Sequence, residues 1–381
     1  MKAKHFAGLD GLRFISITFV VLHHLFTFKA NFGLNQYDYP ILGLIGLYGI
    51  HFFFMGSGFL ITYLLLTEYT EHGKISLKHF FLRRLLRIWP AYYLLLVIAL
   101  LVLLQLPFFR IPGTTDSYLA SNFSKSNQYY FAFLPHVQPF FFPTGPYVHH
   151  TYTIGIEEQF YVIWGLLFVF LRKWIVVFFI AILICYPLLN VLHHYLHTNA
   201  TGESKSIVYL RSGITYLQYS RFSTFAIGSL FGWAYFYQKS WIYLFKKAWL
   251  QLVVYLAIIV SIVMEITVPF LQNEYMAFLM ACLMLIGTFK KESLINYNTG
   301  WLTYLGKISY GIYLFHIVAI VLAAKTTVVL FNMEKNLGVL CFTVVLTMLL
   351  SILFGHLSYF YFETIFLKLK RRFRKVQTGH D

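Results

Sequence analysis

An arginine and a histidine in the first apolar stretch are the first residues that could do chemistry. Arg13 and His24 are 11 positions apart, within about 20° of three full turns at 100° per residue. Both side chains would therefore project from one helix face, about 16 Å apart along the axis. In a membrane helix such groups must find partners or line a wet cavity. His24 has the chemistry of a general base; a structural role, with Arg13 reaching lipid headgroups, is the alternative.

Three further arginines form a cluster. Arg83, Arg84 and Arg87 lie within about one helical turn, just before Trp89 and Pro90. Guanidinium groups grip phosphates in a bidentate manner, so the cluster suits the phosphates of a nucleotide-bearing donor. Contact with lipid headgroups would explain the same charges.

Carboxylates and a hydroxyl mark two other segments. Glu157 and Glu158 stand at the start of an apolar stretch and are followed by Tyr161. Acids favour a helix N-terminus, but two in a row at an apolar boundary exceed what capping requires. Ser57 lies between two glycines, which let a neighbouring helix or a ligand approach closely. Helix packing alone would also explain those glycines.

The other histidines and Glu363 give weaker indications of a functional site. His316 lies inside an apolar run, and Glu363 lies at the inner end of another. His193 and His197 have the i,i+4 spacing of zinc ligands, but no carboxylate completes an HExxH pattern, so we expect no metal. Neither a GxSxG elbow, a Walker loop nor a GxGxxG fingerprint is found, which gives no support to hydrolase, NTPase or dinucleotide chemistry.

These residues must be positioned by membrane helices. Of the 381 residues, 59% are hydrophobic, 20% aromatic and 12% charged, whereas about a quarter of a soluble chain is charged. Apolar runs that approach the roughly 20 residues needed to cross a bilayer are found at 12–31, 41–66, 89–109, 157–171, 174–192, 222–238, 248–266, 271–289, 302–324 and 338–363. We therefore expect an all-α, polytopic membrane bundle of about ten transmembrane helices. Segment 128–142 would be a short or re-entrant eleventh, since its prolines oppose a continuous helix.

The basic residues indicate an orientation. With the N-terminus in the cytoplasm, the inner segments carry twenty lysines and arginines and the outer segments eight, which satisfies the positive-inside rule. This pattern explains the net charge of +16 better than nucleic-acid binding, because no basic face or RNA motif accompanies it. We predict one transmembrane domain over 1–381 in the cell membrane, in contact with membrane lipid. Both termini would be cytoplasmic, with a basic tail over 368–381.

Taken in order, these segments resemble the integral-membrane acyltransferase 3 family. The family's opening motif, an arginine and a histidine separated by ten residues, is matched by LDGLRFISITFVVLHHL. Its second-helix pattern ending in SGF is matched by GIHFFFMGSGFLIT, its arginine segment by FLRRLLRIWPAYY, and its WSLxxEExFY segment by HTYTIGIEEQFY. LGKISYGIYLFH and SYFYFETIF are similar to its last two helices. The resemblance covers about residues 5–370.

The resemblance implies O-acyl transfer from cytoplasmic acyl-CoA, with acetyl as the default acyl group, to a hydroxyl of a cell-surface or lipid-linked glycan. It implies His24 as the catalytic base, Glu157 orienting its imidazole and Arg13 guiding the donor inward. The donor-binding residues would be Arg83, Arg84, Arg87 and Ser57. Direct transfer and a covalent acyl-histidine or acyl-serine intermediate both fit these residues.

The sequence departs from the family pattern on the acceptor side. His51 stands where aspartate is frequent, and Tyr152 and Thr153 replace a tryptophan and a serine. With Tyr161 and His316 they form the predicted substrate-binding set. We also expect no fused SGNH esterase domain.

Several alternatives stay open from the sequence. A polytopic glycan transporter or flippase would use buried His, Arg and Glu in a relay. The acyl group could be succinyl, or the acceptor a non-glycan molecule. Membrane-bound O-acyltransferases of the other large class also use an intramembrane histidine, but the Arg13 and His24 motif argues against that class.

Overall fold

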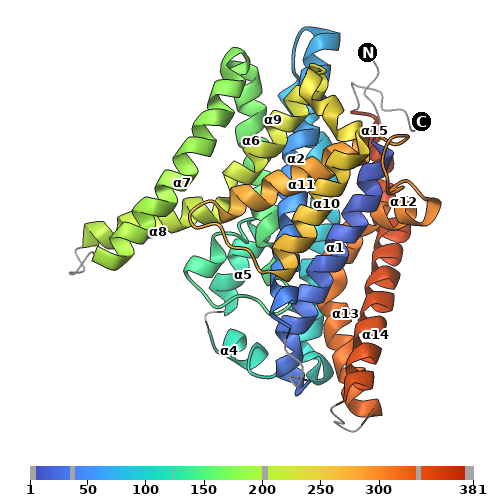
Figure 1. The fold of residues 1–381 in the computed structure, drawn as a ribbon. Helices are drawn as coiled ribbons and strands as arrows, with labels where there is room; N and C mark the ends of the chain where they lie inside the picture. Colours follow the sequence, from blue (N-terminus) through green and yellow to red (C-terminus); the bar gives the residue numbers. More distant parts are fainter. Residues whose placement is uncertain (1–5, 35–38, 122, 200–204, 332–335, 374–381) are drawn as a thin grey trace.

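The computed structural model describes residues 6–34, 39–121, 123–199, 205–331 and 336–373, and its regular elements there are all helical (Figure 1). The α-helices are α1 (Ala7–Phe28), α2 (Pro40–His72), α3 (Leu77–Leu96), α4 (Thr115–Ala120), α5 (Phe123–Phe131), α6 (Tyr152–Phe170), α7 (Ile175–Asn199), α8 (Lys205–Ser220), α9 (Phe222–Phe236), α10 (Ala248–Val263), α11 (Gln272–Thr288), α12 (Gly300–Lys307), α13 (Ser309–Leu330), α14 (Leu337–Leu357) and α15 (Thr364–Arg371). Short 3-10 or π-helical segments include η2 (Val97–Val102), η5 (Gln138–Phe140), η6 (His149–Thr151), η8 (Ser240–Lys246) and η9 (Ser358–Glu363). The predicted all-α membrane class is confirmed.

Each of the ten predicted runs contains a helix, but the helices differ in length. Seven spans of the described residues are long and apolar enough to cross a membrane, and an eighth is reached if η8 and α10, which meet at 80°, form one broken span. The other two runs correspond to α9 and α11, with 15 and 17 residues. Both are shorter than the roughly 20 residues that a straight crossing requires. The chain is thus a multi-pass membrane protein, with seven or eight spans by this criterion against the ten runs of the sequence.

Segment 128–142 does not form one helix. α5 ends at Phe131, the backbone turns through Phe133 with a positive φ of 62°, and η5 follows after Pro135. This interruption agrees with the prolines of the segment, whose rings and missing N–H groups oppose a continuous helix. Of the predicted basic tail, residues 368–371 belong to α15, and 374–381 lie outside the described residues.

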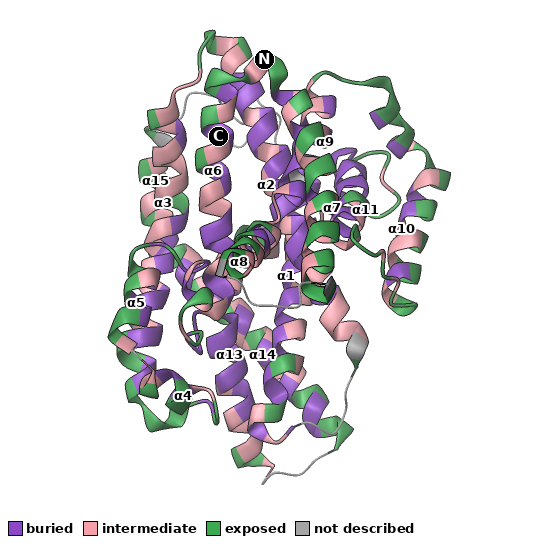
Figure 2. Ribbon diagram, turned by 90° about the vertical axis from the view of Figure 1, so that its left-hand side faces the viewer, coloured by how far each residue is buried: buried purple, intermediate pink, exposed green. Residues whose placement is uncertain are grey.

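α1 lies at the centre of the bundle. It packs against α2 on one side and against α12 and α13 on the other, and α13 pairs with α14. Buried residues are concentrated along α1, α2 and α13 (Figure 2). The first residues of α1 and the helix α15 lie at the same end of the molecule (Figure 1). The helix with the arginine and histidine motif is therefore enclosed by other helices, which gives its ionisable side chains partners within the protein.

Two glycines bring α2 and α9 into backbone contact. A Cβ atom added to Gly58 would lie 2.2 Å from the carbonyl oxygen of Phe225, and one added to Gly228 would lie 1.9 Å from that of Met55. Such distances are shorter than any atomic contact allows, so glycine is required on both helices. The packing holds Ser57, the neighbour of Gly58, at a fixed place in the interior.

Candidate active site

Four histidines meet where α1, α13 and η6 come together. The ring of His24 lies 4.9 Å from that of His316, 5.4 Å from that of His149 and 6.4 Å from that of His150, measured between centroids. His24, His150 and His316 are buried. Despite this clustering, the described residues contain no group of three or more His, Cys, Asp or Glu side chains arranged to hold a metal ion.

The hydrogen bonds of His316 assign the protons of this cluster. Its Nδ1 lies 2.6 Å from the carbonyl oxygen of Tyr313, which can only accept, so Nδ1 carries the proton. In the neutral ring the Nε2 atom is then an acceptor, and it lies 2.9 Å from Nδ1 of His24. His24 therefore donates from Nδ1, and its Nε2 keeps a free lone pair. Nε2 is therefore the atom of His24 that could act as the predicted base. This assignment of the proton positions comes from the hydrogen-bond network.

Tyr313 connects the histidines to α6. Its hydroxyl is within hydrogen-bonding distance of the Thr153 hydroxyl and of the carbonyl oxygen of His150. Both ring nitrogens of His150 are buried without a hydrogen-bond partner among the described residues. A buried polar group without a partner is costly, and active sites are where such groups occur. The predicted substrate residue Thr153 thus lies beside the histidine cluster.

Glu157 is held by two hydroxyl groups. One carboxylate oxygen accepts hydrogen bonds from Ser57 of α2 and from Tyr161, one turn further along α6. The guanidinium of Arg84 lies over the Tyr161 ring, 5.2 Å from its centroid. No hydrogen bond joins Glu157 to His24 in the described part of the chain. In this structure His24 is hydrogen-bonded to His316, and Glu157 to Ser57 and Tyr161.

The charges of Arg13 and Arg87 meet near this carboxylate. Arg13 pairs with Asp10 at 3.2 Å, and its charge also interacts with Arg87 and Glu157. Arg87 in turn interacts with Glu363, which accepts a hydrogen bond of 2.7 Å from Ser358. Arg13 and Arg87 repel each other, so an anion between them would be stabilised.

Arg83 has a different surrounding from its two neighbours. Its guanidinium is 2.9 Å from the buried carboxylate of Glu68 and 3.1 Å from the carbonyl oxygen of Phe373. Glu68 also accepts from the backbone N–H of Ser76, at 2.9 Å. Arg83 thus connects the α2–α3 turn to the end of α15. The three arginines have different surroundings: Arg83 is bound to Glu68, Arg84 lies by Tyr161 and Glu157, and Arg87 lies near Arg13 and Glu363.

His51 lies in another cluster. Its ring contacts the carbonyl oxygen of Leu47 at 2.8 Å, the amide oxygen of Asn273 at 3.1 Å and the guanidinium of Arg221 at 3.2 Å. These contacts join α2 to α11 and to the start of α9. The structure does not bring His51 to the histidine cluster, whereas it brings His316 and Thr153 there. Tyr152 packs at 4.9 Å against the ring of Tyr219, on the α8 side.

Sequence reasoning missed several members of this site. His149 and His150 directly precede the segment that contains Glu157, but their place was not inferred from the pattern. Tyr313, three residues before His316, was the other omission. The available signal was the helical i,i+3 spacing, which puts Tyr313 and His316 on one face.

Comparison with known proteins finds a family model and several relatives. Residues 6–356 match the model of the acyltransferase 3 domain. The chain is 34% identical over 169 residues to a putative O-acetyltransferase of Staphylococcus aureus strain COL, covering 44% of this chain and 25% of the relative. It is 30% identical over 176 residues to the peptidoglycan O-acetyltransferase OatA of Listeria monocytogenes, covering 45% and 25%. With the O-acetyltransferase OatA of Staphylococcus aureus strain NCTC 8325 the identity is 32% over 214 residues, covering 54% and 32%.

These relatives are much longer than the matched region. The chain spans between a quarter and a third of their length. No solved structure matches the chain. The family model nevertheless covers most of the 381 residues, including the helices that carry Arg13, His24, Glu157 and His316. The chain therefore belongs to the acyltransferase 3 family.

Proposed function

We propose that the protein is a membrane O-acyltransferase that moves an acyl group, acetyl by default, from acyl-CoA to a hydroxyl of a cell-surface or lipid-linked glycan. The observation that carries the proposal is the hydrogen bond between His24 and His316, which leaves Nε2 of His24 as a buried base. The names of the relatives as O-acetyltransferases support acetyl.

The chemical step follows from that base. Nε2 of His24 takes the proton of the acceptor hydroxyl as its oxygen attacks the thioester carbonyl. The carbon–sulfur bond then breaks, and the imidazolium returns the proton to the departing thiolate, which gives an ester and free CoA. His316 stabilises the imidazolium by accepting from Nδ1. Direct transfer needs no acyl-enzyme, and Ser57, whose hydroxyl is bound to Glu157, serves to position the carboxylate.

Donor binding is assigned to the arginines around Glu157. Arg84 and Arg87, with Arg13, would hold the anionic part of acyl-CoA, since guanidinium groups bind phosphate oxygens in a bidentate manner. Arg83 is left out of the proposed set, because its guanidinium is 2.9 Å from the buried carboxylate of Glu68. No metal is required by this scheme.

Acceptor binding is assigned to the side of the histidine cluster that faces α6. Thr153 and Tyr313 offer hydroxyl groups beside His150. Tyr152 and Tyr219 supply aromatic faces next to them. Hydroxyls and aromatic faces suit a sugar ring, and one relative is named for acetylation of peptidoglycan. Tyr161, bound to Glu157, is assigned to the donor side instead.

The test compares two adjacent histidines. His24→Gln should abolish ester formation on surface glycans at matched membrane levels, because glutamine cannot act as a base. His23→Gln is the control: His23 packs against Gly46 of α2, and a Cβ atom on that glycine would lie 2.4 Å from it. We expect the control to keep its acyl transfer. Near-normal transfer by His24→Gln would refute the proposed base.

A further inference from the structure

A pocket outside the proposed active site lies between α7 and α8. It has a volume of about 330 Å³ and is lined by Phe140, His193, His197, Val208, Arg211, Ser212 and Thr215. α7 and α8 form an arm that projects sideways from the bundle (Figure 1). The proposed transfer reaction uses none of these residues.

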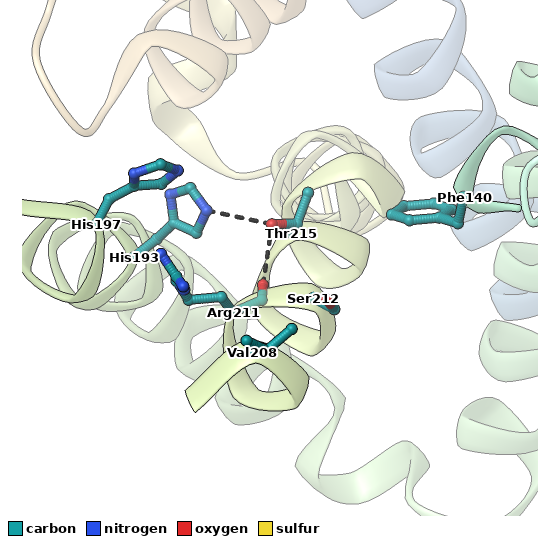
Figure 3. Close-up of a pocket in the computed structure, with 7 residues that line it drawn as sticks. All are labelled: Phe140, His193, His197, Val208, Arg211, Ser212 and Thr215. Carbon is teal, nitrogen blue, oxygen red and sulfur yellow. Dashed lines mark hydrogen bonds between the residues drawn. The ribbon is translucent and has the colours of Figure 1, made fainter. Parts of the chain in front are cut away.

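The polar lining of the pocket contains one guanidinium, two imidazoles and two hydroxyl groups. The side chains of Arg211, His193 and His197 gather on one side of it (Figure 3). The ring centroids of the two histidines are 5.5 Å apart. The seven described lining residues include no carboxylate, and no ion pair of Arg211 is found in the described residues. Residues 200–204 of the α7–α8 connection, including Glu203, are not among them. The guanidinium of Arg211, with no carboxylate in the described lining to neutralise it, favours the binding of an anion.

Hydrogen bonds hold the histidine in place. The Thr215 hydroxyl donates to the carbonyl oxygen of Arg211 at 2.9 Å and lies 3.1 Å from Nε2 of His193 (Figure 3). Because that hydroxyl already uses its proton, His193 must donate to it from Nε2. The network ties α7 to α8 and fixes the ring beside Arg211.

The depth of the pocket in the membrane follows from the outer face of α7. Exposed apolar side chains follow one stripe along this helix: Val177, Ile180, Ile184, Leu188, Val191 and Tyr195. From Val177 to Tyr195 the helix rises about 27 Å, close to the roughly 30 Å of a hydrocarbon core. Arg172, Lys173 and the exposed Trp174 precede the stripe, as is typical of one interface. His193 and His197 flank Tyr195, so the pocket lies near the C-terminal end of the apolar span Arg172–Thr198, opposite to Arg172 and Lys173, and lipid headgroups are expected near the ends of a span.

We propose that this pocket binds the phosphate group of a lipid. Arg211 would contact the phosphate oxygens in bidentate fashion, with His197 and Ser212 as further donors and His193 holding Thr215 in place. The alkyl chain would leave the pocket past Val208 of α8, an exposed apolar residue of the lining. Two sources share this chemistry, a glycerophospholipid and a polyprenyl phosphate of the kind that carries sugars. The site is separate from acyl transfer, so it holds whether or not the proposed function does.

Aromatic rings connect the pocket to the proposed active site. Phe140, in the pocket wall, lies 6.0 Å from the ring of Tyr219, which packs at 4.9 Å against Tyr152 at the start of α6. Thr153, the next residue, contacts Tyr313 of the histidine cluster. A sugar attached to a lipid phosphate in the pocket would extend along aromatic faces toward His24.

The experiment measures lipid binding to the purified full-length protein by native mass spectrometry, without any acyl donor. The probes are polyprenyl monophosphate, phosphatidylglycerol, unphosphorylated polyprenol and inorganic phosphate. We expect both lipid phosphates to bind the wild type, and Arg211→Gln to weaken that binding about tenfold. Arg110→Gln, which removes an exposed arginine charge outside the pocket, should bind as the wild type does. Preference for one lipid phosphate identifies the source.

Three outcomes would overturn the proposal: unchanged binding by Arg211→Gln, equal binding of polyprenol, or binding of inorganic phosphate as tight as that of either lipid. If Arg211→Gln does not fold, the double variant His193→Gln/His197→Gln provides the same comparison. His24→Gln should bind the lipid normally. Loss of acyl transfer and loss of lipid binding are therefore separable results.

Discussion

The backbone carbonyl of Tyr313 determines which nitrogen of His24 is basic. It fixes the proton of His316 on Nδ1, and His316 in turn fixes the proton of His24 on its own Nδ1. In serine hydrolases a carboxylate has the corresponding place beside the base. Here a neutral imidazole takes it, so no buried charge has to be stabilised next to His24 before the reaction begins.

This pairing predicts a loss of turnover in His316→Ala. We expect kcat to fall by about 100-fold, because general-base catalysis contributes on this scale and His24 would lose the acceptor that fixes its tautomer. The KM for acyl-CoA should stay unchanged, since no donor contact is removed. Initial rates in membranes check both constants. His356→Ala, which removes a histidine bound to Tyr304 at 2.6 Å, should change neither.

The arginine cluster predicts opposite effects for adjacent residues. Arg84→Gln should raise the KM for acyl-CoA about tenfold, because it removes a charged hydrogen-bond donor from the proposed phosphate site. Arg83→Gln should leave KM unchanged but destabilise the protein by about 3 kcal/mol, since it leaves the buried Glu68 carboxylate without its counter-ion. Thermal unfolding and donor titrations distinguish the two. A raised KM in Arg83→Gln would return that residue to the donor site.

At the scale of helices, the close crossing of α2 and α9 supports the position of Ser57. Gly228→Ala puts a methyl group 1.9 Å from the Met55 carbonyl oxygen, so the two helices must separate. We expect a loss of about 1–3 kcal/mol, the usual cost of overpacking, with a lower melting temperature and lower activity. Gly213→Ala on α8 meets no atom within 4 Å and is the control. Because alanine has a higher helix propensity than glycine, Gly213→Ala should raise the free energy of unfolding by up to about 1 kcal/mol. Equal melting temperatures for the two variants would contradict this role of the crossing.

The sequence was sufficient to predict the helices, but not which side chains from distant helices contact one another. Composition and apolar runs were sufficient for the all-α membrane class, because the bilayer fixes span length. The register of Arg13 and His24 could be read from helical geometry, since 100° per residue holds in any helix. The partner of His24 could not, because His316 is 292 residues away along the chain and only tertiary packing brings it close. Arg83 and Arg84 are adjacent in sequence, and only the position of Glu68 separates their surroundings.

The number of apolar runs differs from the number of candidate spans because two runs form short helices. The helices within 222–238 and 271–289 have only 15 and 17 residues. α11 is largely buried among its neighbours, and α9 packs closely against α2. Apolar sequence therefore does not distinguish a helix that faces lipid from one that faces protein.

At the scale of the molecule, the proposed reaction requires a donor side and an acceptor side. The first residues of α1 and α15 share one end of the bundle (Figure 1). The distribution of lysine and arginine predicts that this end is cytoplasmic. Arg13 would then meet acyl-CoA from the cytoplasm, and His24, about 16 Å further along α1, would meet the acceptor from outside.

Cysteine labelling in intact cells tests this orientation. In a variant with Cys185, Cys282 and Cys341 replaced by serine, the exposed Ser117 of α4 and the exposed Lys291 after α11 are changed to cysteine one at a time. A membrane-impermeant maleimide should label Ser117→Cys in intact cells, and Lys291→Cys only after permeabilisation. The reverse pattern would place the arginines around Glu157 on the outer side. Cytoplasmic acyl-CoA could not then reach them, and the donor would have to come from outside the cell.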